Sequence, residues 1–409
     1  MHFSNCHGYI RYDEQYPMQV CTCRIPATPG FHNALLQNLL ISWKFVVTHL
    51  AVAGMGAIAS GALQAEEPLL SASRTVIVVT DRAEAFAGNE SVGKIPSGSV
   101  LRYSEENGPW LLIPRYGGWL NREQVVGLER AVDYFTRIIQ EKPTPQAFHH
   151  RGIAHMSLAR YDAAIEDYTR AITQGLTDPG VFINRGVARQ RTGNLTAAIE
   201  DFTRAIELDP SSARAYDNRA GALSEQGHFE AALSDSNEAI RLSPKFAEAH
   251  NNRGVTRRMM GDYEQALADY SQAIELYGEY AAAYANRGFV RKRLGDVAGA
   301  IGDYERAIEL EPSSPAAYND LSWLLATASD PVIRNGSRAV ELAQRACELT
   351  RNRNADYLDT LAAALAEQGD FATAVATAQA AIDLADDAGR GAMQQRLTLY
   401  QAQQPFHED

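Results

Sequence analysis

The chain has 409 residues, which is enough for two or more structural units. An apolar fraction of 45% and a charged fraction of 22% are ordinary for a globular protein. The net charge of −12 argues against a general nucleic-acid binder, because such proteins need a basic surface. The four cysteines are too few and too scattered for a disulfide framework.

An apolar stretch lies near the start of the chain. Lys44 precedes an apolar run over residues 45–62, and small residues continue to Ala65. This order resembles a secretory signal that is cleaved after Ala62 or Ala65. A retained membrane anchor is the alternative, since about 18 apolar residues can just span a bilayer. We therefore assign residues 1–65 to an N-terminal extension with a signal peptide or anchor. We expect an exported protein, periplasmic or in the cell envelope, or one anchored to the membrane.

Between residues 74 and 127 the pattern changes to a period of two. The predicted strands are Thr75–Val79, Val100–Tyr103, Trp110–Ile113 and Gly118–Leu120, with a turn-rich loop at Gly93–Gly98. Short strands separated by Gly, Pro and Asn indicate a small β-barrel. The order Val-Gly-x-Ile-Pro-x-Gly, Gly-x-Trp, Gly-Gly-Trp-Leu resembles the bacterial Src-homology-3-like (SH3-like) family. That resemblance implies binding of peptides or cell-wall material, with Trp110 and Trp119 either as core or rim residues or as ligand platforms.

A single helix is predicted next. Residues 129–140 have helical periodicity, and Pro143 follows. We expect the segment 128–144 to connect the barrel to the next unit and to cap it.

The segment 145–314 contains five copies of one pattern at a spacing of 34 residues. Each copy has a small residue at position 8 and alanine at positions 20 and 27, and most copies have aromatic residues at positions 4 and 24. The pattern resembles the tetratricopeptide repeat family. This resemblance implies two antiparallel helices, A and B, in each repeat. Such hairpins bury their apolar faces only when stacked, which gives a right-handed superhelical α-solenoid whose helices A line a concave groove.

The array continues past residue 314 in a less regular form. We expect a helix A at Ala316–Ala328, an insertion of about five residues, a helix B at Ala339–Leu349, and a seventh repeat at Ala355–Leu384. The two irregular repeats occupy 315–387, so the whole array covers 145–387. Residues 388–409 are assigned to a capping helix, Gly389–Gln403, and a tail. The protein is therefore predicted to be mainly α.

The sequence shows no catalytic motif. It has no Gly-rich phosphate loop, no nucleophile elbow and no His-Glu-x-x-His pattern. His149 and His150 are adjacent, and adjacent side chains on a helix diverge by about 100°, so we expect polar surface or groove residues and not metal ligands. We expect no enzyme activity, no cofactor and no metal.

Arginine fills position 7 of all five regular repeats, and aspartate lies 16 residues later in each. Two opposite charges that recur together predict an ion pair between helices A and B, with a structural role. The predicted pairs are Arg151–Asp167, Arg185–Asp201, Arg219–Asp235, Arg253–Asp269 and Arg287–Asp303.

Position 6 carries asparagine in four repeats and, in the family that the array resembles, faces the groove. Asparagine offers a donor and an acceptor, so it can hold the backbone of an extended peptide. The alternative is a hydrogen bond to the neighbouring helix. Positions 5, 9, 12 and 13 add an apolar floor and a basic lip. The predicted groove residues are Asn184, Asn218, Asn252, Asn286, Val187, Val255, Phe289, Arg258 and Lys292.

These patterns predict a non-catalytic scaffold that binds an extended peptide or partner protein, with acidic and apolar residues, in the groove. A chaperone tail is not expected, because His149 and Ile153 replace the lysine and asparagine of the family's carboxylate clamp. One alternative is a cell-envelope protein whose SH3-like domain binds cell-wall material or peptide, with the array as a spacer or assembly arm. Another is a regulatory subunit of an enzyme complex.

Overall fold

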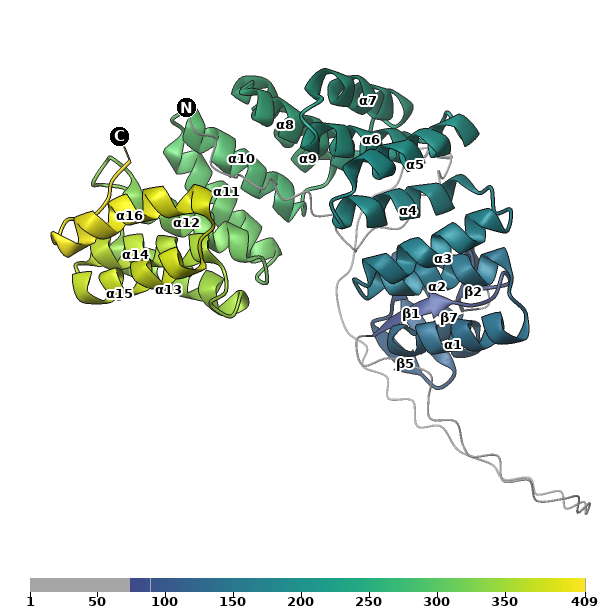
Figure 1. Ribbon diagram of the computed structural model, residues 1–409. Helices are drawn as coiled ribbons and strands as arrows, with labels where there is room; N and C mark the ends of the chain where they lie inside the picture. Colours follow the sequence, from purple (N-terminus) through teal and green to yellow (C-terminus); the bar gives the residue numbers. More distant parts are fainter. Residues whose placement is uncertain (1–73, 89, 409) are drawn as a thin grey trace, which may run out of the picture. The chain divides into compact units, whose positions relative to one another are not determined.

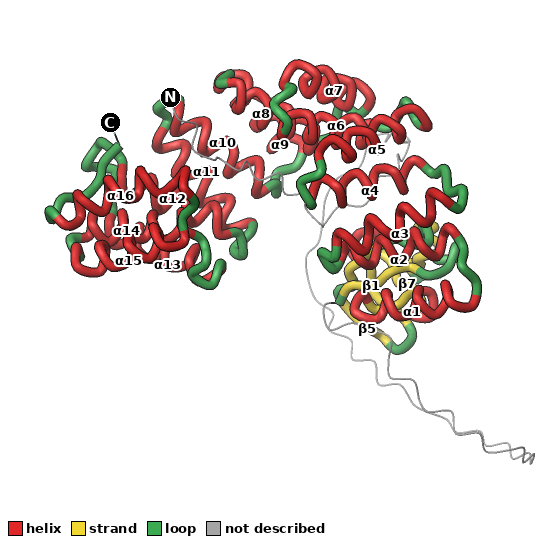
Figure 2. Tube along the Cα trace, in the orientation of Figure 1, coloured by secondary structure: helices red, strands yellow, loops and turns green. Residues whose placement is uncertain are grey.

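The computed structural model describes residues 74–88 and 90–408. The predicted signal peptide or anchor lies outside these residues. The described residues form two compact units, and the boundary between them along the chain lies between Tyr134 and Phe135. Strands lie in the N-terminal unit and the C-terminal unit is helical (Figure 2). Within 74–88 and 90–408, no helix combines the length and the apolar character that a bilayer crossing needs.

The N-terminal unit contains two antiparallel sheets in its described residues. The strand orders are β4-β1-β8 and β3-β2-β7-β6-β5. Alternate apolar residues, among them Val76, Leu111 and Leu120, are fully buried and form the core of this unit. The strands are β1 (Thr75–Val78), β2 (Glu84–Ala87), β3 (Glu90–Lys94), β4 (Val100–Arg102), β5 (Glu105–Asn107), β6 (Trp110–Ile113), β7 (Gly118–Asn121) and β8 (Val125–Gly127).

The four predicted strands correspond to β1, β4, β6 and β7 and are confirmed. The loop predicted at Gly93–Gly98 was wrong at its start, because β3 extends to Lys94. The sequence also missed β2, β5 and β8. Strands β3 and β5 consist mostly of exposed polar residues, so they lack the apolar alternation that marks a strand. The pairing establishes a small antiparallel β region, and the SH3-like barrel stays a prediction.

The C-terminal unit is a succession of antiparallel helix pairs (Figure 1). The second half of α1 contacts the first pair, since the Phe135 ring lies 5.5 Å from the His150 ring. The helices are α1 (Leu128–Glu141), α2 (Pro145–Ser157), α3 (Tyr161–Thr173), α4 (Pro179–Arg191), α5 (Leu195–Leu208), α6 (Ala213–Glu225), α7 (Phe229–Leu242), α8 (Ala247–Met260), α9 (Tyr263–Leu276), α10 (Ala281–Arg293), α11 (Val297–Leu310), α12 (Pro315–Thr327), α13 (Gly336–Leu349), α14 (Ala355–Gln368), α15 (Phe371–Leu384) and α16 (Asp387–Gln401).

The helix boundaries follow from capping. Asn194 and Ser212 accept hydrogen bonds from the backbone of the first turns of α5 and α6. Gly193 and Gly261 adopt φ values of 80° and 87° between helices A and B, a conformation that glycine adopts without strain. In the irregular part, α13 begins three residues before the predicted Ala339, because Asn335 caps it.

Small residues at position 8 allow the two helices of a repeat to approach closely. A Cβ atom added to Gly186 would lie 2.6 Å from the Phe202 ring, which is fully buried. In the third repeat, where position 24 is Ser236, position 8 is the larger Ala220. The size of the residue at position 8 therefore compensates for the size of the residue at position 24.

Candidate peptide-binding surface

The position-7 arginines fix each helix A between two helices B. Arg185 donates from Nε to Asp201 Oδ2 at 3.0 Å and from Nη2 to Oδ1 at 2.6 Å. Its Nη1 donates to Thr169 Oγ1 of the preceding repeat at 3.2 Å. The same Arg–Asp pairing occurs in all five regular repeats, which confirms the predicted ion pairs.

Two parts of this network were missed from the sequence. The recurrent polar residue at position 25 supplies the acceptor for the next repeat's arginine, as Thr203 does for Arg219 at 3.2 Å. A second arginine at position 11 reaches the same aspartate in three repeats, through Arg189, Arg257 and Arg291. Both signals recur at 34 residues and could have been found by the same alignment of repeats.

The asparagine column lies between neighbouring helices A. Asn252 Nδ2 donates to both carboxylate oxygens of Asp217, at 3.1 and 3.0 Å. Asn286 Nδ2 donates to Asn251 Oδ1 at 3.0 Å, and Asn184 Nδ2 lies 3.4 Å from His149 Nε2. Each bond joins position 5 of one repeat to position 6 of the next. Three of the four asparagines thus contact the neighbouring helix, as in the alternative stated above.

Asn218 differs from the other three asparagines. It follows the apolar Ile183 by 35 residues, so position 5 of the preceding repeat offers no side-chain acceptor. Its side chain is 1% exposed, and its Nδ2 makes no hydrogen bond to the described residues. Asn252 is also buried, whereas Asn184 and Asn286 are half-buried and keep accessible surface.

The Asp217 carboxyl has an unusually high pKa because it is buried in this packing. Burial raises its pKa to about 7 from 3.8, the Asn252 bond and Arg214 lower it, and Glu248 raises it. A carboxyl whose pKa rises on folding stabilises the fold only when protonated. This contribution is fully present below about pH 4 and is lost as the pH rises through about 7.

We expect Asp217→Asn to stabilise the chain more at about pH 8 than at about pH 5, with a difference on the order of 1–4 kcal/mol between the two pH values. The amide cannot ionise, yet its oxygen still accepts from Asn252. Urea unfolding at the two pH values measures the effect, with the exposed Asp133→Asn as the matched control. The same pH dependence in parent and Asp217→Asn would contradict the assignment.

The apolar floor and the basic residues of the predicted groove have different exposures. Val187 and Val255 are 8% and 2% exposed, so they pack between helices. Phe289 is half-buried, and the Arg258 guanidinium lies 5.1 Å from the centre of its ring. Arg258 Nε makes no hydrogen bond within the described residues. Arg258 on α8 and Phe289 and Lys292 on α10 are half-buried, so they keep more accessible surface than the two valines.

Residues 405–408, which we call the C-terminal segment, lie on helices A of the last repeats. Glu408 accepts from Trp323 Nε1 at 2.7 Å and from Lys292 Nζ at 2.8 Å. The Glu408 backbone N–H donates to the Thr327 carbonyl at 2.7 Å. The sequence predicted a tail after the last helix but none of these contacts.

Aromatic and charged side chains flank these bonds. The Phe406 ring lies 5.9 Å from the Trp323 ring, and the Arg396 guanidinium lies 5.6 and 5.3 Å from these two ring centres. His407 Nε2 lies 2.7 Å from Glu367 Oε2. The C-terminal segment thus makes side-chain contacts at three successive residues.

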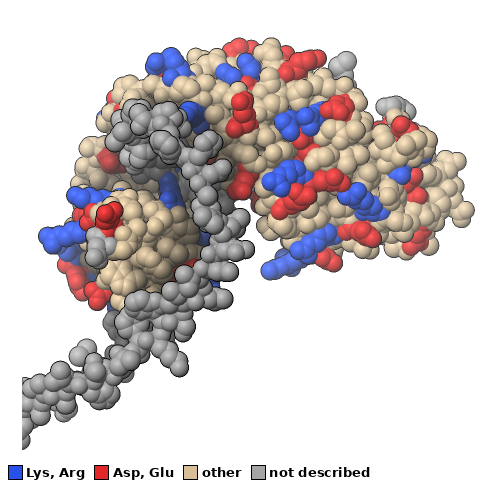
Figure 3. Space-filling view, turned by 180° about the vertical axis from the view of Figure 1, so that it is seen from behind, with Lys and Arg blue, Asp and Glu red and all other residues tan. Residues whose placement is uncertain are grey.

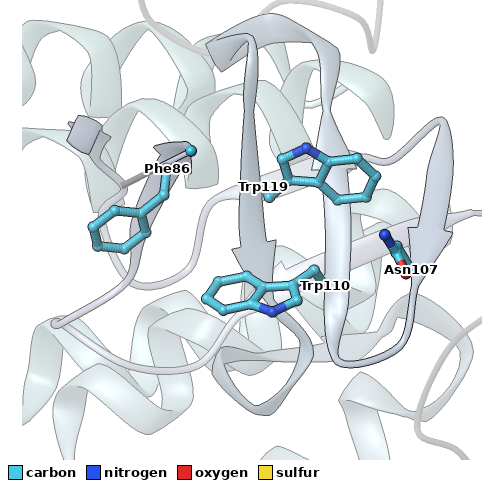
Figure 4. Close-up of a pocket in the computed structure, with 5 residues that line it drawn as sticks. Phe86, Asn107, Trp110 and Trp119 are labelled. Atoms are coloured by element: carbon cyan, nitrogen blue, oxygen red, sulfur yellow. The ribbon is translucent and has the colours of Figure 1, made fainter. Parts of the chain in front are cut away.

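The N-terminal unit has an open aromatic cavity of about 500 Å³. Most of its lining residues come from the neighbouring strands β2, β7, β6 and β5, and Figure 4 shows the Phe86 ring and the two indoles around the open space. Trp110 is 36% exposed and Trp119 is half-buried, so both lie at the rim of the cavity rather than in the core. Gly88 and Asn107 complete the lining.

The described residues hold no group of three or more His, Cys, Asp or Glu side chains that could bind a metal ion. On the face drawn in Figure 3, acidic and basic side chains are interspersed and do not separate by sign. The one cysteine in the described residues, Cys347, is buried and unpaired.

Tetratricopeptide repeat models match this chain at residues 149–213, 183–245, 247–280 and 281–314. No catalytic domain was identified by that comparison. A search of curated proteins found no match.

Two solved structures with TM-scores above 0.5 share the fold at low sequence identity. Yeast Tom70 is 17% identical with a TM-score of 0.51, over 68% of this chain and 59% of Tom70. A chain of the APC/C hetero-tetramer Cut9-Hcn1 is 12% identical with a TM-score of 0.54, over 66% of this chain and 52% of that one. MamA is 24% identical over 39% of this chain, with a TM-score of 0.35.

Proposed function

We propose that this chain, whose residues 149–245 and 247–314 are tetratricopeptide repeats, is a non-catalytic scaffold that binds an extended peptide or partner protein in the groove lined by its helices A. Proteins built from these repeats generally mediate protein–protein interactions. The match to this family supports the binding of a protein partner, and the side chains of helices A support the kind of partner that is proposed.

The observation that carries the proposal is the surface of Arg258, Phe289 and Lys292. These side chains come from α8 and α10 and are half-buried, so a partner can reach them. An aromatic ring beside two cations suits a segment that contains apolar and acidic residues, because apolar contact and charge complementarity act together. Asp320 lies near both cations, and burial raises its pKa to about 6, so it offsets their charge less at acidic pH.

Charge reversal on this surface tests the proposal. The parent chain and the Arg258→Glu/Lys292→Glu variant are used to capture proteins from the envelope fraction of the source cell. We expect a captured protein to be lost with the variant, by about tenfold or more, since repulsion replaces two favourable charge contacts. The control variant, Arg204→Glu/Arg241→Glu, changes two exposed arginines of helices B that form only weak surface pairs.

Equal capture by the parent and the groove variant would contradict the proposal. It would favour a second candidate function, in which the aromatic cavity of the N-terminal unit holds the ligand. That candidate rests on the exposed Trp110 and the half-buried Trp119, whose rings form a platform of the kind that binds peptides or sugars. Loss of capture with Trp110→Ala would then identify that cavity as the site.

We further propose that the protein is exported and acts in the periplasm or cell envelope, either released or anchored through residues 45–62. The cation, the apolar run and the small residues that follow support this location.

A further inference from the structure

The C-terminal segment lies at positions that would contact a ligand. Lys292 is at position 12 of the fifth repeat, and Trp323 is at position 9 of the sixth. Thr327 and Glu367 are at position 13 of the sixth and seventh repeats. Phe289 is at position 9 and Arg258 is at position 12 of the regular repeats, and position 13 was also predicted to face the groove. The proposed groove thus already holds a short piece of the chain at its C-terminal end.

The contacts of this segment define what the surface recognises. An aromatic ring at the first position packs against Trp323 under the Arg396 guanidinium. A carboxylate two positions later receives one indole N–H and one ammonium group. Charge-assisted bonds of this kind are stronger than neutral ones, and the backbone bond to Thr327 fixes the register.

The supporting residues are held in place before any ligand arrives. Arg396 forms a bidentate pair with Asp359, at 3.0 and 2.6 Å, and Glu367 is paired with Arg334 at 2.9 Å. These partners are part of the array and not of the C-terminal segment. A preorganised surface loses less entropy on binding, so it suits an exchangeable peptide.

We propose that Lys292, Trp323 and Arg396 form a site for a partner segment with an aromatic residue followed two positions later by Glu or Asp. The C-terminal segment occupies this site as an intramolecular competitor. Because it is tethered, its effective concentration at the site is in the millimolar range, and a partner must displace it. The claim that this site belongs to the groove that binds the partner rests on the proposed function. The existence of the site rests only on the contacts of the C-terminal segment.

A labelled peptide tests the site. Fluorescence anisotropy is used to titrate a synthetic peptide of residues 402–408 with the full chain and with its Phe406→Ala/Glu408→Gln variant, in which the competing contacts are removed. We expect the variant to bind the peptide about tenfold or more tightly than the parent does. Lys292→Glu added to this variant should weaken binding by about tenfold, while the matched Lys245→Glu, in an exposed loop, should not.

Several outcomes would overturn the inference. No binding of the labelled peptide to the variant, at variant concentrations up to about 1 mM, would exclude a peptide site here. Equal binding to the parent and the variant would exclude the competitor, and binding that is indifferent to Lys292→Glu would place the peptide elsewhere. A dimer of the parent chain that the Phe406→Ala/Glu408→Gln variant does not form, measured by light scattering, would show that the segment occupies a second copy and not its own chain.

The peptide titration and the capture experiment together distinguish a failure of this inference from a failure of the proposed function. If the peptide binds as expected but the captured envelope protein is unaffected by Arg258→Glu/Lys292→Glu, the site stands and the proposed function fails. If capture depends on the groove but the peptide does not bind, the proposed function stands and the inference fails.

Discussion

Replacing Arg219 with leucine should lower the free energy of unfolding by about 3–5 kcal/mol, because it leaves a buried carboxylate without its cation. Asp235 is 7% exposed, and Arg219 holds both of its oxygens, at 2.7 and 2.9 Å. In the other regular repeats a second basic residue or histidine stands at position 11, but in the third repeat that residue is Leu223. Urea unfolding followed by circular dichroism measures the loss.

Arg253→Leu is the matched comparison. It removes the same position-7 arginine from the fourth repeat but leaves Arg257, which lies 2.7 Å from Asp269. We therefore expect a smaller loss than for Arg219→Leu, about 1–3 kcal/mol. An unchanged melting temperature for Arg253→Leu would refute a stabilising role for the pair.

A double substitution separates the pair from the general cost of altering a core position. Arg219→Leu/Asp235→Leu removes both charges and leaves no unpaired carboxylate, so it should recover much of the stability lost by Arg219→Leu alone. If the double variant is less stable than the single one, packing and not the unpaired charge is the cause. Since repeat arrays can unfold in parts, hydrogen exchange in α6 and α7 should locate the loss.

Sequence periodicity was sufficient for the helical part of the fold. The repeat of small residues and alanines carried the family resemblance that implied the helix pairs, and the recurrence of arginine with aspartate predicted which side chains pair. Both predictions use contacts within one repeat, so the same signal appears five times. Strands β3 and β5 escaped prediction for the opposite reason, since each is a single short polar segment.

The candidate site was predicted less completely than the fold. Helical periodicity places Lys292 and Phe289 on one face, but it does not reveal which asparagines pair with the next helix. Those bonds join positions 35 residues apart, and they depend on what position 5 offers: a carboxylate at Asp217 or an apolar side chain at Ile183. The contact between Glu408 and Trp323 joins residues 85 apart through one unpatterned segment, so no local signal predicts it.

The close approach of helices A and B leads to the second large effect. Phe202 is fully buried, and Phe202→Ser should cost about 3–5 kcal/mol, since it leaves a cavity beside Gly186. Gly186→Ala should cost about 1–3 kcal/mol, because the new methyl group would lie 2.6 Å from the ring. Gly302→Ala on α11 is the control. No atom lies within 4 Å of its added Cβ, so it should stabilise the helix by up to about 1 kcal/mol.

Combining Gly186→Ala with Phe202→Ser recreates the pair that the third repeat already uses, Ala220 with Ser236. The methyl group then enters space that the ring has left. We therefore expect the double variant to be more stable than the sum of the two single losses predicts, by about 1–2 kcal/mol. Denaturant unfolding of the four proteins gives this coupling energy. If the two single losses simply add, the two positions do not compensate for each other. The third repeat would then tolerate serine at position 24 for a reason other than the size of Ala220.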